Sequence, residues 1–270
     1  MSGGTPEPTA RWASGGAYLS YVGRWSALVA PAFLERLAVE PGRRWLDVGC
    51  GTGILTRGIL DGAAPASVVG IDPADGFLAD AIAATPDPRA TFRAGSAAAT
   101  GLADGAVDSV VSGLVLNFVP DVGAALRESV RVARAGAVVG GYVWDYAEGM
   151  AFIRAFWEVA AALDPAAEAY DQRRRFPIAA PDPLRAAFTD AGLMDVLTDA
   201  IEIPTTFADF DDLWIPFTGG TGQAPTYLAT LDPARRDALR EALRGNVPID
   251  ADGAIRLSAR AWACWGRTRA

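Results

Sequence analysis

The sequence predicts a doubly wound α/β fold: a mostly parallel sheet with an N-terminal helical flank and two insertions. Short apolar runs rich in valine, isoleucine and alanine alternate with stretches of helical periodicity from residue 43 onward. Strands of this kind, separated by helices, form parallel βαβ units whose helices cover both faces of the sheet. A glycine-rich turn also joins one of these strands to a helix, which is typical of open α/β sheets that bind nucleotides.

Segments with strand character occur at residues 43–49, 67–72, 90–94, 108–114, 137–144, 195–203 and 254–266. Helical periodicity predicts helices at about 53–61, 75–84, 122–134, 149–163, 182–191 and 232–244. Upstream, residues 12–37 repeat apolar side chains at helical spacing with breaks at glycine and proline, which predicts two short helices. We therefore divide the chain into an N-terminal leader with lid helices (1–40) and a core domain (41–270). Residues 145–180 and 205–250 are insertions that we expect to fold over the substrate as a cap.

The composition excludes several classes of function. Among 270 residues there is no histidine, and all 24 basic side chains are arginine. Histidine-dependent hydrolases, histidine zinc sites and lysine Schiff bases are therefore ruled out, and we expect no metal. The net charge of −8 repels a nucleic-acid backbone, and no apolar stretch approaches the ~20 residues that span a bilayer, so we expect neither as a partner. Cys50 and Cys264 cannot build a disulfide framework, which favours a reduced, cytoplasmic setting.

The glycine turn lies in the stretch LDVGCGTG and spaces Gly49, Gly51 and Gly53 as G-x-G-x-G. Dinucleotide folds use G-x-G-x-x-G, but Ile54 occupies the place of the third glycine. Asp47, two residues before the first glycine, would repel a pyrophosphate by roughly 1 kcal/mol even when screened, and it would attract an ammonium group. The alternative is a tight turn that needs no ligand.

A second acidic residue, Asp72, closes the next strand, VVGID. An acid at this position accepts hydrogen bonds from both ribose hydroxyls of a nucleotide, although on its own it would more often cap the helix that follows. Two acidic residues around a glycine turn fit a ligand that is a nucleoside with a positively charged tail. S-adenosylmethionine is such a molecule.

The sequence resembles the class I S-adenosylmethionine-dependent methyltransferases, in the small-molecule group that includes ubiquinone-biosynthesis-like enzymes. The resemblance is carried by LDVGCGTG (46–53), Asp72, the Ser96-Ala97 turn, LVLNFVPD (114–121) and RVARAGAVV (131–139). It implies a Rossmann-like methyltransferase fold with a seven-stranded sheet, in which the last strand is antiparallel between strands five and six. It also implies S-adenosyl-L-methionine as the cofactor, bound across the carboxyl ends of the first strands.

Transferred onto this chain, the resemblance makes Gly49, Cys50, Gly51 and Gly53 the loop that approaches the methionine moiety, with Asp47 supporting the loop or the ammonium group. Asp72 then takes the ribose. The remaining cofactor contacts border the adenine, line the cleft or hold the carboxylate. They are expected from Pro73, Ser96, Ala97, Leu114, Arg24 and Tyr18. A surface ion pair is an equally good interpretation of Arg24.

Catalytic groups are harder to assign. Asn117 and Phe118 stand where related enzymes often have two histidines, and neither can take a proton. Asn117 is expected to orient the acceptor, unless it makes only a structural hydrogen bond. Asp145, at the end of the fifth strand, is our first choice for a base, since the acceptor should lie at that edge. A helix N-cap is the alternative role for Asp145.

These observations predict a methyltransferase that acts on a hydrophobic or aromatic small molecule by O-, N- or C-methylation and releases S-adenosylhomocysteine. The aromatic second insertion supports that choice of acceptor, unless its aromatic side chains form only the insertion's own core; they are Phe207, Phe210, Trp214, Phe217 and Tyr227. One alternative is an enzyme that retains the cofactor for cyclisation or decarboxylation. Another is a non-catalytic binding subunit. A homodimer is compatible with the sequence.

Overall fold

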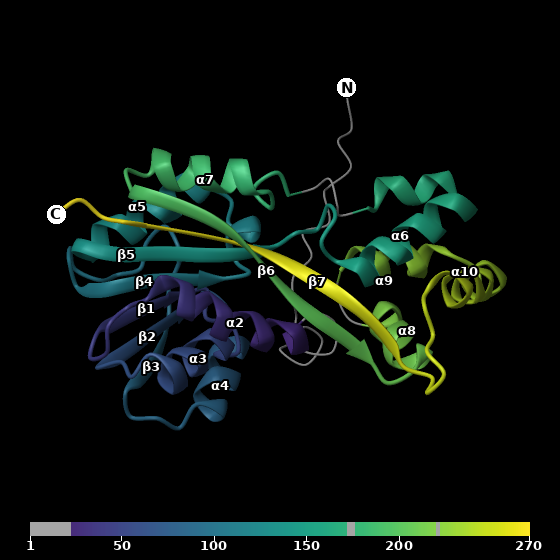
Figure 1. Ribbon diagram of the computed structural model, residues 1–270, viewed down its shortest axis with the longest axis horizontal. Helices are drawn as coiled ribbons and strands as arrows, with labels where there is room; N and C mark the ends of the chain where they lie inside the picture. The colour runs from purple at the N-terminus through teal and green to yellow at the C-terminus, as the bar shows by residue number, and fades with distance from the viewer. Residues whose placement is uncertain (1–22, 172–175, 220–221) are drawn as a thin grey trace.

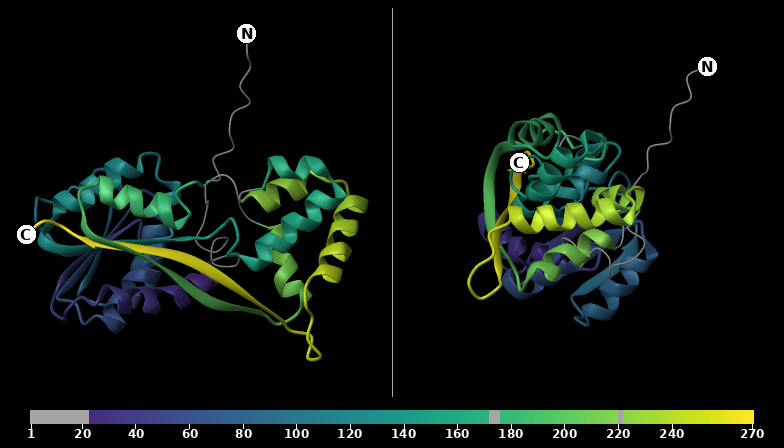
Figure 2. Two further views of the ribbon diagram at one scale, coloured as in Figure 1. Left: turned by 45° about the horizontal axis from the view of Figure 1, so that its top comes forward. Right: turned by 90° about the vertical axis from the view of Figure 1, so that its right-hand side faces the viewer.

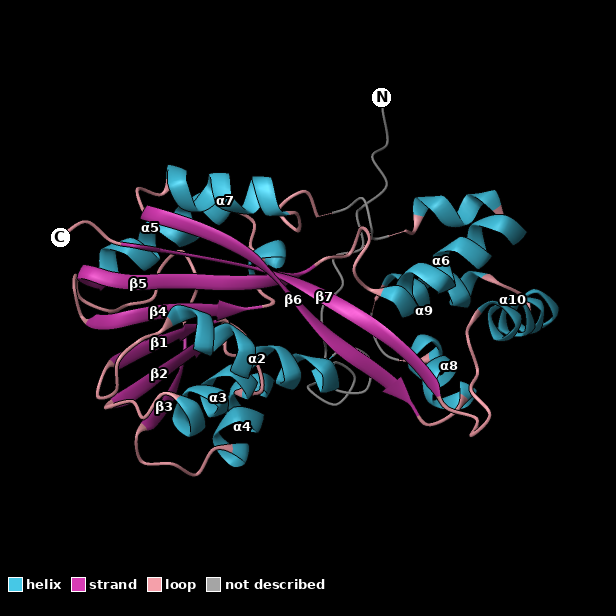
Figure 3. Ribbon diagram, in the orientation of Figure 1, coloured by secondary structure: helices cyan, strands magenta, loops and turns pink. Residues whose placement is uncertain are grey.

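The computed structural model describes residues 23–171, 176–219 and 222–270. Within these ranges a seven-stranded sheet has the order β3-β2-β1-β4-β5-β7-β6 (Figures 1 and 3). Its strands are β1 (Arg44–Val48), β2 (Ser67–Asp72), β3 (Ala90–Ala94), β4 (Val107–Gly113), β5 (Ala133–Trp144), β6 (Met194–Phe207) and β7 (Ile255–Arg267). Strands β1 to β5 pair in parallel, and β7 is antiparallel to both β5 and β6. The predicted fold is confirmed, including the antiparallel last strand between the fifth and the sixth.

Helices cover both faces of this sheet, as the alternation of strands and helices predicts. One face carries α2 (Arg24–Leu37), α3 (Ile54–Gly62) and α4 (Asp75–Ala84), and the other carries α5 (Val122–Val132) and α7 (Pro181–Asp190) (Figure 1). The sheet's central strands are buried on both sides; Leu46, Ile71 and Val111 are inaccessible to solvent. Such strands need continuous apolar runs, which is why they were recognisable in the sequence.

Three elements differ from the prediction. Residues 12–22 lie outside the described residues, and the rest of the expected helical flank is the single helix α2, which contains Pro31. Strand β5 begins at Ala133, earlier than predicted, where Ala133 pairs with Val107 of β4. Strand β6 continues past residue 203 to Phe207, because β7 supplies a partner for every residue up to that point. Pro204 is tolerated there because β6 is an edge strand.

The two predicted insertions supply helices that pack together as one helical lobe. We use this name for α6 (Ala151–Leu163), the 3₁₀ turn η3 (Pro165–Ala169), α8 (Phe210–Thr218), α9 (Gln223–Thr230) and α10 (Pro233–Asn246). Figure 2 shows the lobe beyond the carboxyl edge of the sheet, at the end of the long antiparallel pair β6–β7. The ring of Phe156 stacks on Phe217 with centroids 4.6 Å apart, and Trp157 contacts Tyr227. These pairs join the first insertion to the second.

The aromatic residues of the second insertion therefore have a structural role. Phe207, Phe210, Trp214, Phe217 and Tyr227 are all buried among neighbours in the lobe or on the strand pair β6–β7. Their apolar character does not by itself indicate an aromatic acceptor, and that part of the sequence argument does not hold. No helix within the described ranges is long and apolar enough to cross a membrane.

Candidate functional site

The glycine turn ties the end of β1 to the end of β2. The amides of Gly49 and Cys50 both donate to the carbonyl of Ile71, at 2.8 and 2.9 Å. Gly49 has φ +70°, and a Cβ at this position would stand 2.6 Å from both methyl groups of Val115. Only glycine meets both demands, since other residues avoid this backbone region and would also clash.

Asp72 holds the same turn from the neighbouring strand. Its Oδ2 accepts from the Gly51 amide at 3.1 Å, and its Oδ1 accepts from the Ala74 amide at 2.9 Å. Each carboxylate oxygen has a second lone pair, so the side chain retains the capacity to accept hydrogen bonds from a ligand. Burial raises the pKa of Asp72, and the two backbone amides oppose that shift.

Asp47 at the end of β1 has an unsatisfied oxygen. The side chain is 1% exposed, and its Oδ2 accepts from the Thr56 hydroxyl at 2.7 Å. Its Oδ1 is buried and has no hydrogen-bond partner among the described residues. Burial, with a smaller contribution from Asp72, raises the pKa of Asp47 to about 7. A buried acceptor without a donor is costly, so this oxygen fits a cationic ligand group that would donate to it.

A cavity of about 760 Å³ opens at the carboxyl ends of β1, β2 and β4. It gathers nine of the predicted residues from separate segments: Asp47, Gly49, Cys50, Gly51, Asp72, Pro73, Ser96, Ala97 and Leu114. No arginine lines it among the described residues, so its only charged side chains there are the two aspartates. This charge distribution fits a sulfonium and an ammonium group and opposes a phosphate. The contacts of these residues with a cofactor remain a prediction.

Leu114 gives independent support for a ligand at this edge. It has φ +62°, in the left-handed region that a branched side chain rarely adopts. Its amide donates to the carbonyl of Tyr142 at 2.7 Å, which holds the strained conformation at the end of β4. Backbone strain of this kind concentrates at functional sites.

Two residues expected to bind the cofactor are placed outside the cavity lining. Gly53 caps α3 with φ +79° and so serves the turn itself. Arg24 forms an ion pair with Asp212 of α8, at 2.7 Å, and its guanidinium stacks over Trp25 and Phe207. The structure thus places Arg24 in a link between α2 and the helical lobe, as the alternative interpretation, an ion pair, predicts. Tyr18 lies outside the described residues.

The two proposed catalytic residues do not line the cavity either. Asp145 is buried, and Arg260 donates to its Oδ2 from Nε and Nη2, at 2.9 and 2.7 Å. Its Oδ1 accepts from the Glu148 amide in the turn after β5; α6 begins at Ala151 with Met150 as its N-cap, so Asp145 does not have the alternative role of a helix N-cap either. Asn117 lies in the 3₁₀ turn η2 (Leu116–Phe118), and its Nδ2 is buried without a partner among the described residues. The engaged carboxylate of Asp145 argues against its use as a base.

Several lining residues escaped prediction from the sequence. Phe77 and Tyr142 supply apolar wall, and Ser26 and Thr52 supply hydroxyl groups. Phe77 lies one turn into the helix that follows Asp72, a position that the placement of that acid could have indicated. Ser26 has no such signal, because α2 precedes the sheet in the chain and reaches the cavity only through packing.

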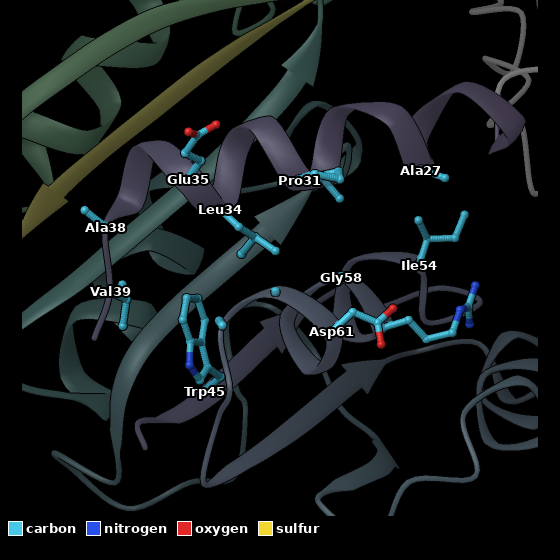
Figure 4. Close-up of a pocket in the computed structure, with 14 residues that line it drawn as sticks. Ala27, Pro31, Leu34, Glu35, Ala38, Val39, Trp45, Ile54, Gly58 and Asp61 are labelled. Atoms are coloured by element: carbon cyan, nitrogen blue, oxygen red, sulfur yellow. The ribbon is translucent and has the colours of Figure 1, made fainter. Parts of the chain in front are cut away.

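A second cavity, of about 660 Å³, lies between α2 and α3 (Figure 4). Figure 4 shows Pro31 and Leu34 of α2 above Gly58 and Asp61 of α3, with Trp45 at one end. It contains none of the predicted site residues. We assign function to the first cavity because that one combines the glycine turn, two buried carboxylates and a strained backbone.

Comparison with known proteins identifies the family of the chain. Residues 46–140 match the methyltransferase domain family model. A demethylmenaquinone methyltransferase of Roseiflexus sp. (strain RS-1) is 40% identical over 108 residues, which are 38% of this chain and only 44% of that protein. A demethylmenaquinone methyltransferase of Roseiflexus castenholzii is 31% identical over 173 residues, which are 59% of this chain and 72% of that protein.

The fold is also shared with a solved methyltransferase. Phosphoethanolamine N-methyltransferase 2 of Haemonchus contortus, solved with S-adenosyl-L-methionine, has a TM-score of 0.57 at 16% identity, over 94% of this chain and 56% of that one. At this identity the likeness concerns the fold alone. The assignment to a family rests on the Roseiflexus castenholzii relative, because this chain is 31% identical to it and covers 72% of its length. The chain belongs to the class I S-adenosylmethionine-dependent methyltransferases.

Proposed function

We propose that this protein binds S-adenosylmethionine in the 760 Å³ cavity and methylates a hydrophobic small molecule at its mouth. The observation that carries the proposal is the pair of buried aspartates in a cavity without a described cation, one of them with an unpaired oxygen. Two relatives are named demethylmenaquinone methyltransferases, and a demethylmenaquinone is a hydrophobic quinone. This agrees with the apolar side chains of Phe118, Val119 and Pro120 in the cavity lining.

Different residues of the cavity would contact different parts of the cofactor. Asp47 Oδ1 would accept from the ammonium group, which restores the hydrogen bond that this oxygen lacks. Asp72 would accept from the ribose hydroxyls while its backbone contacts hold it in place. Phe77 and Leu114 would cover the apolar surface of the nucleoside, and Ser96 supplies a hydroxyl near the turn after β3.

When bound, the cofactor would supply a methyl group on a sulfonium for transfer to the acceptor atom, with S-adenosylhomocysteine as the product that leaves. The protein contributes position and exclusion of water. The Cys50 thiol stays protonated in the cavity, because burial and the two neighbouring aspartates raise its pKa. Asp47 and Asp72 would both be engaged by the cofactor, so neither is free to act as a base. The acceptor must therefore present a nucleophilic atom that reacts without a dedicated base from this lining, such as an amine, a readily ionised hydroxyl or an activated carbon.

The first test is isothermal titration with S-adenosylmethionine and S-adenosylhomocysteine. We expect wild type to bind both and Asp72→Ala to bind at least tenfold more weakly, since hydrogen bonds to charged groups contribute about 1.5–3 kcal/mol. Asp80→Ala is the matched control, because this exposed aspartate on α4 is outside the cavity lining. Absence of binding by wild type would refute the proposal.

The second test is production of S-adenosylhomocysteine in the presence of hydrophobic quinols, phenols and amines. Turnover with any of them supports methyl transfer. Tight cofactor binding, with no turnover across the three classes, would favour the alternative in which the cofactor is retained for another reaction.

A further inference from the structure

Three aromatic rings pack one against the next, and the first of them, Phe118, lines the cofactor cavity. Phe118 contacts Phe176 edge to face, with centroids 5.4 Å apart and planes at 75°. Phe176 in turn contacts Tyr146, with centroids 5.1 Å apart. We call Phe118, Phe176 and Tyr146 the aromatic wall.

The wall is assembled from three separate segments at one edge of the sheet. Phe118 ends the 3₁₀ turn after β4, Tyr146 follows β5, and Phe176 precedes α7. Strands β4 and β5 are parallel neighbours, so the segments that follow them meet at the same carboxyl edge. Phe118 itself lines the cofactor cavity, which places the wall beside the bound cofactor of the proposed function.

The exposure of the three rings is graded toward the cavity. Tyr146 is buried and Phe176 is half-buried, whereas Phe118 is 46% exposed. The two inner rings fix the position of Phe118, and its remaining surface stays open. Large apolar surface at the mouth of a cavity is a feature of ligand sites, because a ligand that covers it recovers the cost of exposure.

We propose that the aromatic wall binds the acceptor through an aromatic ring of its own, with Phe118 as the residue that determines this specificity. The inference rests on the proposed function and narrows its substrate class from hydrophobic to planar aromatic. Offset or edge-to-face aromatic pairs favour a ring over an aliphatic group of equal size, which a wall of rings can exploit. The aromatic residues inside the helical lobe cannot serve this purpose, since they are buried against one another.

The test measures binding of naphthol and of its saturated counterpart decalol at saturating S-adenosylhomocysteine. The two probes have similar size and one hydroxyl each, but only naphthol is aromatic. We expect wild type to prefer naphthol. In Phe118→Leu, which keeps apolar volume without the ring, naphthol should bind about tenfold more weakly while decalol changes less than twofold. Ile82→Leu, at an exposed site on α4 outside the cavity lining, should change neither.

The outcomes separate this inference from the proposed function. If wild type fails to bind S-adenosylhomocysteine, the proposed function falls, and the inference with it. If the cofactor product binds but Phe118→Leu binds naphthol as tightly as wild type, the proposed function stands and the aromatic inference is overturned. Competition between naphthol and S-adenosylhomocysteine would also overturn it, because the probe would then occupy the cofactor cavity and not the wall.

A second variant guards against a local rearrangement at Phe118. Phe176→Leu removes the ring that supports Phe118 from behind, and we expect the same loss of preference for naphthol over decalol. Phe176→Leu, at a position outside the cavity lining, should retain the affinity of wild type for S-adenosylhomocysteine within about threefold. A large loss of that affinity in Phe118→Leu, with naphthol binding unchanged, would assign Phe118 to the cofactor and refute the inference.

Discussion

Asp145 and Arg260 join the end of β5 to the middle of β7. Both Nε and Nη2 of Arg260 donate to one oxygen of Asp145, whose side chain is only 5% exposed. The backbones of these residues are also paired, through the Asp145 amide and the Arg260 carbonyl at 2.9 Å. Gly149 fits against both side chains, since a Cβ there would stand 2.7 Å from the Cβ of each. The ion pair thus fixes the point where the chain leaves the sheet for the helical lobe.

A structural role for this pair predicts that its two members behave alike. We expect Asp145→Asn and Arg260→Gln each to lower the free energy of unfolding by about 1–3 kcal/mol, because each leaves a partly buried partner unsatisfied. Denaturant unfolding measures this directly. A catalytic base would give a different result: Asp145→Asn would lose turnover with unchanged stability, and Arg260→Gln would not reproduce the loss.

The glycine turn predicts a difference between two glycine substitutions of the same kind. Gly49→Ala should lower the free energy of unfolding by roughly 2–4 kcal/mol, since it meets both the left-handed backbone and the methyl groups of Val115. Gly51→Ala, with φ +52° and nothing within 4 Å of the new Cβ, should cost only about 1 kcal/mol. Thermal unfolding distinguishes the two. Adding Val115→Ala to Gly49→Ala should recover the steric part, and failure to do so would disprove this explanation.

The ion pair of Arg24 with Asp212 predicts that Arg24 does not hold the cofactor. Arg24→Gln should leave the affinity for S-adenosylhomocysteine within twofold of wild type, whereas Asp47→Asn should weaken it at least tenfold. The stability cost of Arg24→Gln should stay below about 1 kcal/mol, because both side chains of the pair remain about one-third exposed. Calorimetry on the two variants makes the comparison. A tenfold loss in Arg24→Gln would restore the expectation drawn from the sequence.

The sequence predicts the parts of this site whose signals are local. The glycine turn, Asp47 and Asp72 follow from short strands with a fixed order, and the structure brings them to one cavity. The partners of Arg24 and Asp145 lie 188 and 115 residues away, so no local pattern could reveal that these charges are already engaged. The sequence does not predict the aromatic wall for the same reason, since Phe118 and Phe176 come into contact only once the sheet is formed. Residues whose contacts depend on long-range packing are therefore the ones whose partners a local sequence pattern does not reveal.

Asp47 predicts two opposite effects of pH. Its pKa is raised from an ordinary value of 3.8 to about 7, so between these values the folded protein holds a proton that the unfolded chain has lost. The stability of the ligand-free protein should consequently fall as the pH rises from 4 to 7. Asp47→Asn removes this contribution, so its stability relative to wild type should increase across that range. Burial also raises the pKa of Asp72, but this residue is present in both proteins, so its effect on the pH dependence of stability cancels in the comparison.

The affinity for S-adenosylhomocysteine should rise with pH, whereas the stability of the ligand-free protein falls. An ammonium group requires the ionised form of Asp47, so S-adenosylhomocysteine should bind about tenfold more tightly at pH 8 than at pH 6. Titrations in buffers of different ionisation enthalpy should show release of a proton near neutral pH. Asp47→Asn should show neither effect, and Asp80→Asn should show both. A flat pH profile for wild type would mean that Asp47 does not meet the ammonium group.

The helical lobe predicts that stability and cofactor binding can be separated. Phe217 on α8 is 1% exposed and stacks on Phe156, so Phe217→Ala should cost about 3–5 kcal/mol. Ile215 on the same helix is 61% exposed, and Ile215→Ala should change the stability by less than about 0.5 kcal/mol. Neither residue lines the cofactor cavity, and no residue of α8 does. Phe217→Ala should therefore bind S-adenosylhomocysteine within twofold of wild type while its turnover with an acceptor falls, on the expectation that the two insertions cap the acceptor. A parallel loss of cofactor affinity would instead show that the lobe and the sheet fold and bind as one cooperative unit.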